Sequence, residues 1–93
     1  MLKVNSRSSS AVIFPLQISA ARVLLGMSQQ ELASAASIGL GTVKRIEAAR
    51  DELAGTAQTI GRIQRALEAK GIIFIEQDGG NGPGVRLRKP IRL

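Results

Sequence analysis

Two adjacent cations, Lys44 and Arg45, are the side chains of this sequence best suited to binding a polyanion. They lie between Val43 and Ile46, whose spacing predicts a helix over 40–49 with the apolar pair inward and the basic pair outward. Ammonium and guanidinium groups on such a helix can bind phosphates and the acceptor edges of guanine. The pattern fits two interpretations, a helix that contacts nucleic acid and a helix face on which both cations are only solvated.

Most enzyme and metal chemistry lacks its usual residues here. The sequence contains no histidine and no cysteine. Disulfides, thiolate zinc sites, a histidine general base and a thiol nucleophile are therefore excluded. A carboxylate-only enzyme is the remaining catalytic alternative. We expect no enzymatic activity, no cofactor and no metal.

The charge balance favours an acidic partner. The formal net charge is +6 over 93 residues, which favours nucleic acid or an acidic surface. The last ten residues contain Arg86, Arg88, Lys89 and Arg92 and no acid. For residues 85–92 three interpretations stay open: a wing that touches phosphates, a solvated strand edge that discourages aggregation, and part of a dimer interface. Arg86 and Arg88 are thus candidate contacts to the DNA backbone.

Start and stop signals divide the first part of the chain into four predicted helices, over 15–25, 29–36, 40–49 and 57–70. Pro15 suits a first helical turn, and Gly26 suits a helix end. Ser28 and Glu31 form the pattern of a capping box, in which each side chain bonds the backbone N–H of the other. Thr56 is the expected cap of the last helix, which ends at Gly71.

The chain changes character after these helices. The apolar run 72–75 is typical of a strand, and 85–88 alternates apolar and basic residues as a half-exposed strand does. The glycine-rich stretch 78–84 leads into that strand rather than into a helix, so it predicts a turn and not a phosphate cradle. The predicted fold class is mainly α, with four helices followed by a C-terminal β-hairpin. We divide it into a flexible arm (1–14), a helical domain (15–71) and a hairpin with a basic tail (72–93).

The two central predicted helices carry a family resemblance. The segments SQQELA at 28–33 and TVKRIE at 42–47 resemble the Cro-type (xenobiotic-response-element-like) helix-turn-helix transcriptional regulators. The resemblance extends from 18–22 to 68–71, and the tail 71–88 is similar to a small bacterial branch of the family. It implies a phage-repressor-like domain that places helix 40–49 in the major groove of DNA.

The resemblance also implies roles by position. Gln29 matches a glutamine that contacts DNA in many members, and Ser28 beside it is a candidate backbone contact as well as a cap. Arg50 lies where phosphate contacts are common. The surface that would face DNA holds Gly39, Leu40, Gly41, Thr42, Lys44 and Arg45. Two departures are that Ser37 stands at the usual turn glycine, and that Leu40 and Gly41 replace a polar pair that often reads bases.

These features predict a cytoplasmic, sequence-specific transcriptional regulator, a repressor or autoregulator, that binds double-stranded DNA. No run of apolar residues reaches the length needed to span a membrane. The alternative from another class is an antitoxin-like or anti-activator module that binds a protein and for which DNA is secondary.

We also expect a homodimer that binds an inverted repeat. Its predicted interface is the hairpin, because four consecutive large apolar residues exceed what one face of a hairpin buries. The residues are Ile72, Ile73, Phe74, Ile75, Val85 and Leu87. The alternative is a monomeric hairpin folded back over the helices.

Overall fold

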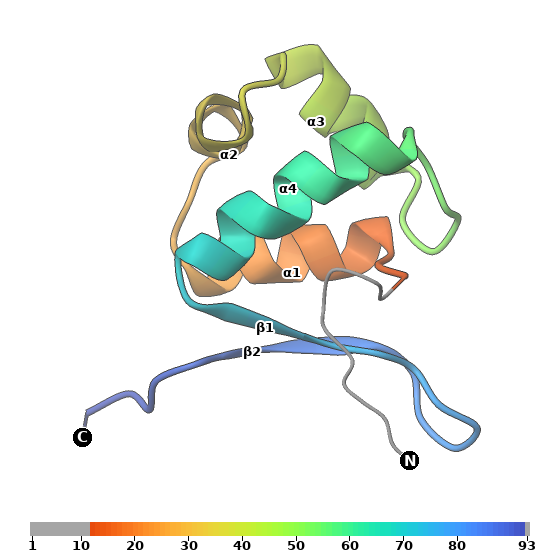
Figure 1. Ribbon diagram of the computed structural model, residues 1–93, viewed down its shortest axis with the longest axis vertical. Coiled ribbons are helices and arrows are strands. Elements are labelled where there is room, and N and C mark those ends of the chain that lie inside the picture. The colour runs from red at the N-terminus through yellow and green to blue at the C-terminus, as the bar shows by residue number, and fades with distance from the viewer. Residues whose placement is uncertain (1–11, 93) are drawn as a thin grey trace.

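The computed structural model describes residues 12–92 as four helices followed by a two-stranded antiparallel hairpin (Figure 1). The elements are α1 (Pro15–Leu24), α2 (Gln29–Ala36), α3 (Leu40–Ala48), α4 (Ala57–Ala69), β1 (Ile72–Ile75) and β2 (Gly84–Leu87). The predicted fold class is confirmed. The second strand begins a residue earlier than expected, and Arg88 lies just beyond it.

The helix boundaries follow from the capping signals of the sequence. Ser28 Oγ accepts the N–H of Glu31 at 3.0 Å, and Glu31 Oε1 accepts the N–H of Ser28 at 2.8 Å. Thr56 Oγ1 likewise accepts the N–H of Thr59 at 3.1 Å. Gly71, with φ of +105°, follows α4 in a conformation that favours glycine. These contacts fix where each helix can start and stop.

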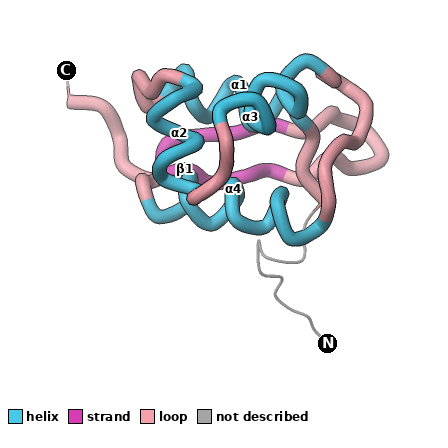
Figure 2. Tube along the Cα trace, turned by 90° about the horizontal axis from the view of Figure 1, so that it is seen from above, coloured by secondary structure: helices cyan, strands magenta, loops and turns pink. Residues whose placement is uncertain are grey.

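The elements form layers, with the hairpin at one end of the molecule and α2 and α3 at the other (Figure 1). The hairpin is edge-on in Figure 1 and face-on from above in Figure 2. Between the two ends, α1 packs over β2 and α4 packs over β1. The normal to the two-stranded sheet therefore points toward α3.

One aliphatic core joins these layers. Its fully buried large side chains come from all four helices and β1: Ile18, Leu32, Val43, Ile46, Ile63, Leu67 and Ile72. Ile13, inside the expected N-terminal arm 1–14, is also buried in this core; residues 1–11 of that arm lie outside the described residues. The hairpin shares the core of the helices, so it is not a separate unit.

The hairpin buries alternate positions only. Ile72 pairs with Leu87 and Phe74 with Val85 on the face toward the helices, and Ile72 and Phe74 are buried there. Ile73 and Ile75 are 37% and 42% exposed on the other face. Ile72 and Phe74, two of the residues predicted at a dimer interface, are therefore buried inside a single copy of the chain. The hairpin folds back over the helices with one face, and its other face stays uncovered within one copy of the chain.

A buried glutamine fastens the hairpin to α1. Gln17 Nε2 donates to the carbonyls of Ile75 (3.2 Å) and Gly84 (3.0 Å), the last residue pair before the turn. Its Oε1 accepts the N–H of Phe14 at 2.7 Å and so caps α1. Because the side chain is only 3% exposed, these bonds are shielded from water and hold the strands at a fixed place under α1.

Candidate nucleic-acid interface

The exposed side of α3 is a basic stripe flanked by small residues. Lys44 and Arg45 are exposed, and so are Gly41 and Ala48, a turn before and a turn after them. Positions spaced by three, four and seven residues share one helix face. Two cations thus stand on a surface that can come close to a partner, because nothing bulky projects beside them. Ala48 was not singled out from the sequence, although its spacing from Arg45 placed it on this face.

The opposite side of α3 is locked into the core. Val43 and Ile46 are fully buried. The turn 37–39 before the helix is tight, because Ser37 ends α2 in the left-handed conformation with φ of +58°. That conformation favours glycine and costs a residue with a Cβ about 1 kcal/mol. The burial of α3 on one side leaves its basic stripe as the outward side of the α2–α3 pair.

An ion pair fixes α3 to α1. Arg22 Nε donates to Glu47 Oε2 at 2.9 Å, and Arg22 Nη2 donates to Glu47 Oε1 at 3.0 Å. Arg22 Nη1 also donates to the carbonyl of Met27 at 2.9 Å, just before α2. The two side chains are 18% and 7% exposed, so this bidentate pair is largely removed from solvent. It therefore sets the angle at which α3 stands on the helices below.

The same carboxylate orients Gln29, which the sequence assigned to DNA contact. Gln29 Nε2 donates to Glu47 Oε1 at 3.1 Å, so the amide nitrogen is held inside the domain. The amide oxygen, which has no bond among the described residues, is the end of Gln29 that a ligand can reach. Arg22 and Glu47 are not among the site residues predicted from the sequence, because the contact between them joins two helices that are distant in the chain.

The network also changes the acidity of Glu47. Burial raises the pKa of the Glu47 carboxyl, but hydrogen bonds from Arg22, Gln29 and Ser19 outweigh burial and hold it below its ordinary value. The hydrogen bond to Glu47 raises the pKa of the Arg22 guanidinium. Both groups therefore stay charged over the whole neutral range.

The remaining candidates on the α2–α3 pair divide into exposed and structural ones. Gly39, which is exposed, caps α3 without a side-chain bond. Thr42 is half-buried, and Leu40 is half-buried and packs against the core. Leu40 therefore offers only part of its side chain to a ligand. Ser28 is exposed, but its hydroxyl oxygen already accepts the N–H of Glu31 in the cap of α2.

Arg50, in the loop after α3, has an unusual backbone. It is exposed and adopts φ of +58°, the left-handed region in which glycine is preferred. Its carbonyl accepts the N–H of Leu16 at 3.0 Å, which ties the loop to α1. The Cβ of Arg50 therefore strains the backbone. Among the described residues, the Arg50 guanidinium makes no hydrogen bond or ion pair that would offset this cost.

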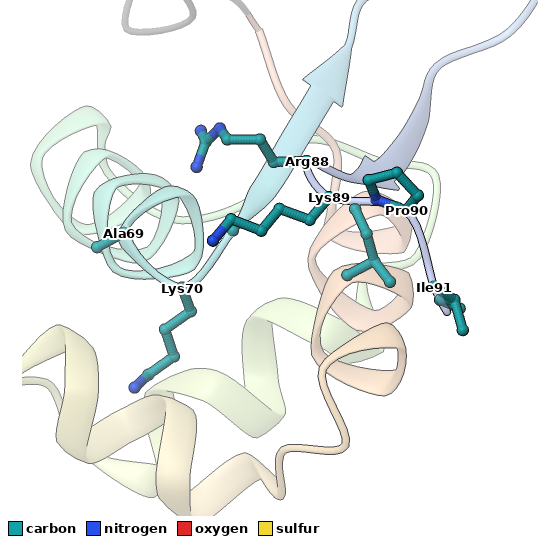
Figure 3. Close-up of a pocket in the computed structure, with 8 residues that line it drawn as sticks. Ala69, Lys70, Arg88, Lys89, Pro90 and Ile91 are labelled. Atoms are coloured by element: carbon teal, nitrogen blue, oxygen red, sulfur yellow. The ribbon is translucent and has the colours of Figure 1, made fainter. Parts of the chain in front are cut away.

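The basic hairpin is not brought together with α3. Arg86 and Arg88 belong to the end of the molecule opposite α3 (Figure 1). Arg88 Nη1 donates to the carbonyl of Glu68 at 3.3 Å, at the end of α4. Figure 3 shows Arg88 and Lys89 in the hollow beside Ala69 and Lys70. A DNA duplex on the α3 face therefore lies away from Arg86 and Arg88 of the same copy.

Residues 12–92 hold neither a cluster of metal-binding side chains nor a membrane-spanning helix. No group of three or more acidic, histidine or cysteine side chains there is placed to hold a metal ion. None of the helices in that range is long and apolar enough to cross a membrane. Comparison with protein-family models and with curated proteins found no match for this chain.

Proposed function

We propose that this protein is a sequence-specific DNA-binding transcriptional regulator of the repressor or autoregulator kind, and that it inserts α3 into the major groove. The observation that carries the proposal is the exposed stripe of Lys44 and Arg45 between Gly41 and Ala48, on a helix anchored by the Arg22–Glu47 pair. A helix that stands on a rigid base with basic side chains outward matches the shape and charge of that groove.

In this proposal the groups around α3 contact different parts of the DNA. Arg45 and Lys44 bind guanine edges and nearby phosphates. Gln29, oriented by Glu47, contacts the DNA at the start of α2. Arg50 binds a phosphate beside the groove. The net charge of +6 adds attraction at a distance and does not depend on sequence.

Arg50 offers a test in which stability and binding change in opposite directions. Arg50→Gly removes the cation and also the Cβ that strains the left-handed backbone. We expect the free energy of unfolding to rise by about 1 kcal/mol, while affinity falls by a similar factor on specific and scrambled DNA. The slope of log affinity against log salt concentration should shrink by about 0.9.

The measurements are denaturant unfolding and DNA titrations at several salt concentrations. The control is Arg92→Gly, which removes the same charge from the C-terminal tail and should leave the salt slope unchanged. Arg65 is not suitable for this control, because it lies inside helix α4. An Arg50→Gly protein that is more stable and binds DNA with an unaltered salt slope contradicts the phosphate role.

One observation favours the alternative of a protein-interaction module. The outer side of α1 is apolar and exposed, with Val23 68% and Leu24 46% accessible, and such surfaces mark protein contacts. Capture of a co-encoded partner, together with absent DNA selectivity, would favour this function. Selective DNA binding by the purified chain alone supports the regulator.

A further inference from the structure

The loop 76–83 joins the two strands and extends from the hairpin away from the helices (Figure 1). It contains Asn81, the one asparagine among the described residues, followed by Gly82. Both residues are exposed. Within the described part of the chain, neither the side chain of Asn81 nor the N–H of Gly82 makes a hydrogen bond. An unbonded side-chain amide and a free backbone nitrogen therefore stand next to each other in solvent.

This arrangement permits one covalent step. The Gly82 nitrogen, once it has lost its proton, attacks Cγ of Asn81. The new C–N bond closes a succinimide ring, and the bond between Cγ and Nδ2 breaks with release of ammonia. Water then opens the ring at either carbonyl and leaves an aspartyl or an isoaspartyl residue. The net change is one water taken up and one ammonia lost, so no oxidant or reductant is needed.

The hydrogen bonds of the turn favour the step. The N–H of Asp78 donates to the carbonyl oxygen of Asn81 at 2.9 Å. That carbonyl belongs to the peptide group whose nitrogen is the nitrogen of Gly82. The bond therefore stabilises the negative charge that the peptide group gains when the nitrogen loses its proton. Gly82 also places no Cβ beside the attacking nitrogen, so the ring can close without crowding.

We propose that Asn81 is a site of spontaneous modification, and that its isoaspartyl product is a substrate for a methyltransferase that recognises such residues. The modification lowers the formal net charge of +6 by one, and the isoaspartyl form lengthens the backbone of the turn. The strands should keep their place, because Gln17 bonds the carbonyls of Ile75 and Gly84 on either side of the loop. The reaction is independent of DNA binding, since the hairpin and α3 lie at opposite ends of the molecule (Figure 1).

A second pair in the same loop, Asp78 and Gly79, also places an acyl side chain before a glycine. Asp78 Oδ1 accepts the N–H of Gly80 at 2.7 Å and the N–H of Asn81 at 2.8 Å. These bonds hold the pKa of the Asp78 carboxyl below its ordinary value, so the group is ionised at neutral pH. A carboxylate is a poor electrophile because it has no neutral group to release. Asn81 is therefore the reactive residue of the loop.

Mass spectrometry of the full chain, incubated without DNA at neutral and at mildly alkaline pH, tests the proposal. We expect a progressive exchange of ammonia for water, which digestion with trypsin should locate in the peptide 71–86. The exchange should be faster at the higher pH, because the attacking nitrogen must lose its proton. Transfer of labelled methyl groups by an isoaspartyl methyltransferase measures the second product. A full chain whose mass stays constant overturns the proposal, and so does an exchange confined to Asn5.

Three variants separate Asn81 from its neighbours. Gly82→Ala should slow the exchange strongly and still fold, because Gly82 does not adopt the left-handed conformation and has open space where a Cβ would stand. Gly79→Ala adds the same methyl group at another open position of the loop and should leave the rate unchanged. Asn81→Gln should lose both the exchange in peptide 71–86 and the methyl transfer to it. Methyl transfer that persists there would assign the reaction to Asp78 and overturn the proposal, as would an equal rate in Gly82→Ala and the parent.

Discussion

Replacing Lys44 and Arg45 together by alanine is expected to weaken binding to the preferred DNA sequence by about 2–4 kcal/mol, roughly 30- to 1,000-fold. Both side chains are exposed on α3, so the fold should be unaffected and the loss should come from bonds to bases and phosphates. Arg45→Ala alone should also relax the preference at one base position of each half-site.

Fluorescence anisotropy titrations with preferred and scrambled duplexes measure these losses. The control removes two exposed cations that lie elsewhere, Arg65 on α4 and Arg92 in the C-terminal tail. It lowers the net charge equally, and it should weaken both duplexes alike and only modestly. An equal loss in the control would show that overall charge, not the α3 stripe, provides the binding.

Glu47→Ala is expected to destabilise the fold by about 3 kcal/mol. The substitution leaves the largely buried Arg22 guanidinium and the Gln29 amide without their shared acceptor. For a domain whose total stability is on the order of 5–15 kcal/mol, this is a large fraction. DNA affinity should fall as well, because α3 loses its fastening to α1.

The lowered pKa of Glu47 makes this contribution depend on pH. A carboxyl whose pKa is lower in the folded than in the unfolded chain stabilises the fold fully above its ordinary range, and the stabilisation is lost as pH falls through the lowered pKa. Denaturant unfolding at a series of acidic pH values should therefore show parent and Glu47→Gln converging. Glu52→Gln, which changes an exposed carboxyl in the loop, should follow the parent. A constant gap between parent and Glu47→Gln across the series would contradict this role.

The local parts of the fold could be predicted from sequence because their causes are local. The cap made by Ser28 and Glu31 spans a single helical turn, and Gly71 ends α4 by its own backbone freedom. Hydrophobic spacing then assigned the buried side of α3. The same reasoning placed Lys44 and Arg45 outward, which the structure confirms.

What could not be predicted depends on contacts between distant residues. Gln17 reaches the hairpin across most of the chain, and a lone glutamine in an apolar helix gives no sign of which carbonyls it bonds. The run 72–75 suggested burial on both faces, but the helices lie on one side only, so Ile73 and Ile75 stay exposed. The apolar side of α1, which holds Leu16, Ala20, Val23 and Leu24, is likewise exposed in the structure, and its sequence alone does not show which side of the helix faces solvent.

Selection of bound duplexes from a random DNA pool tests the central claim most directly. The purified chain should enrich an inverted repeat whose half-sites are about 34 Å apart, one turn of DNA, matching two α3 helices on one side of a dimer. The protein with Lys44 and Arg45 replaced by alanine should enrich no motif under the same conditions. A parent protein that enriches nothing, or a double variant that enriches the same motif as the parent, would contradict the account.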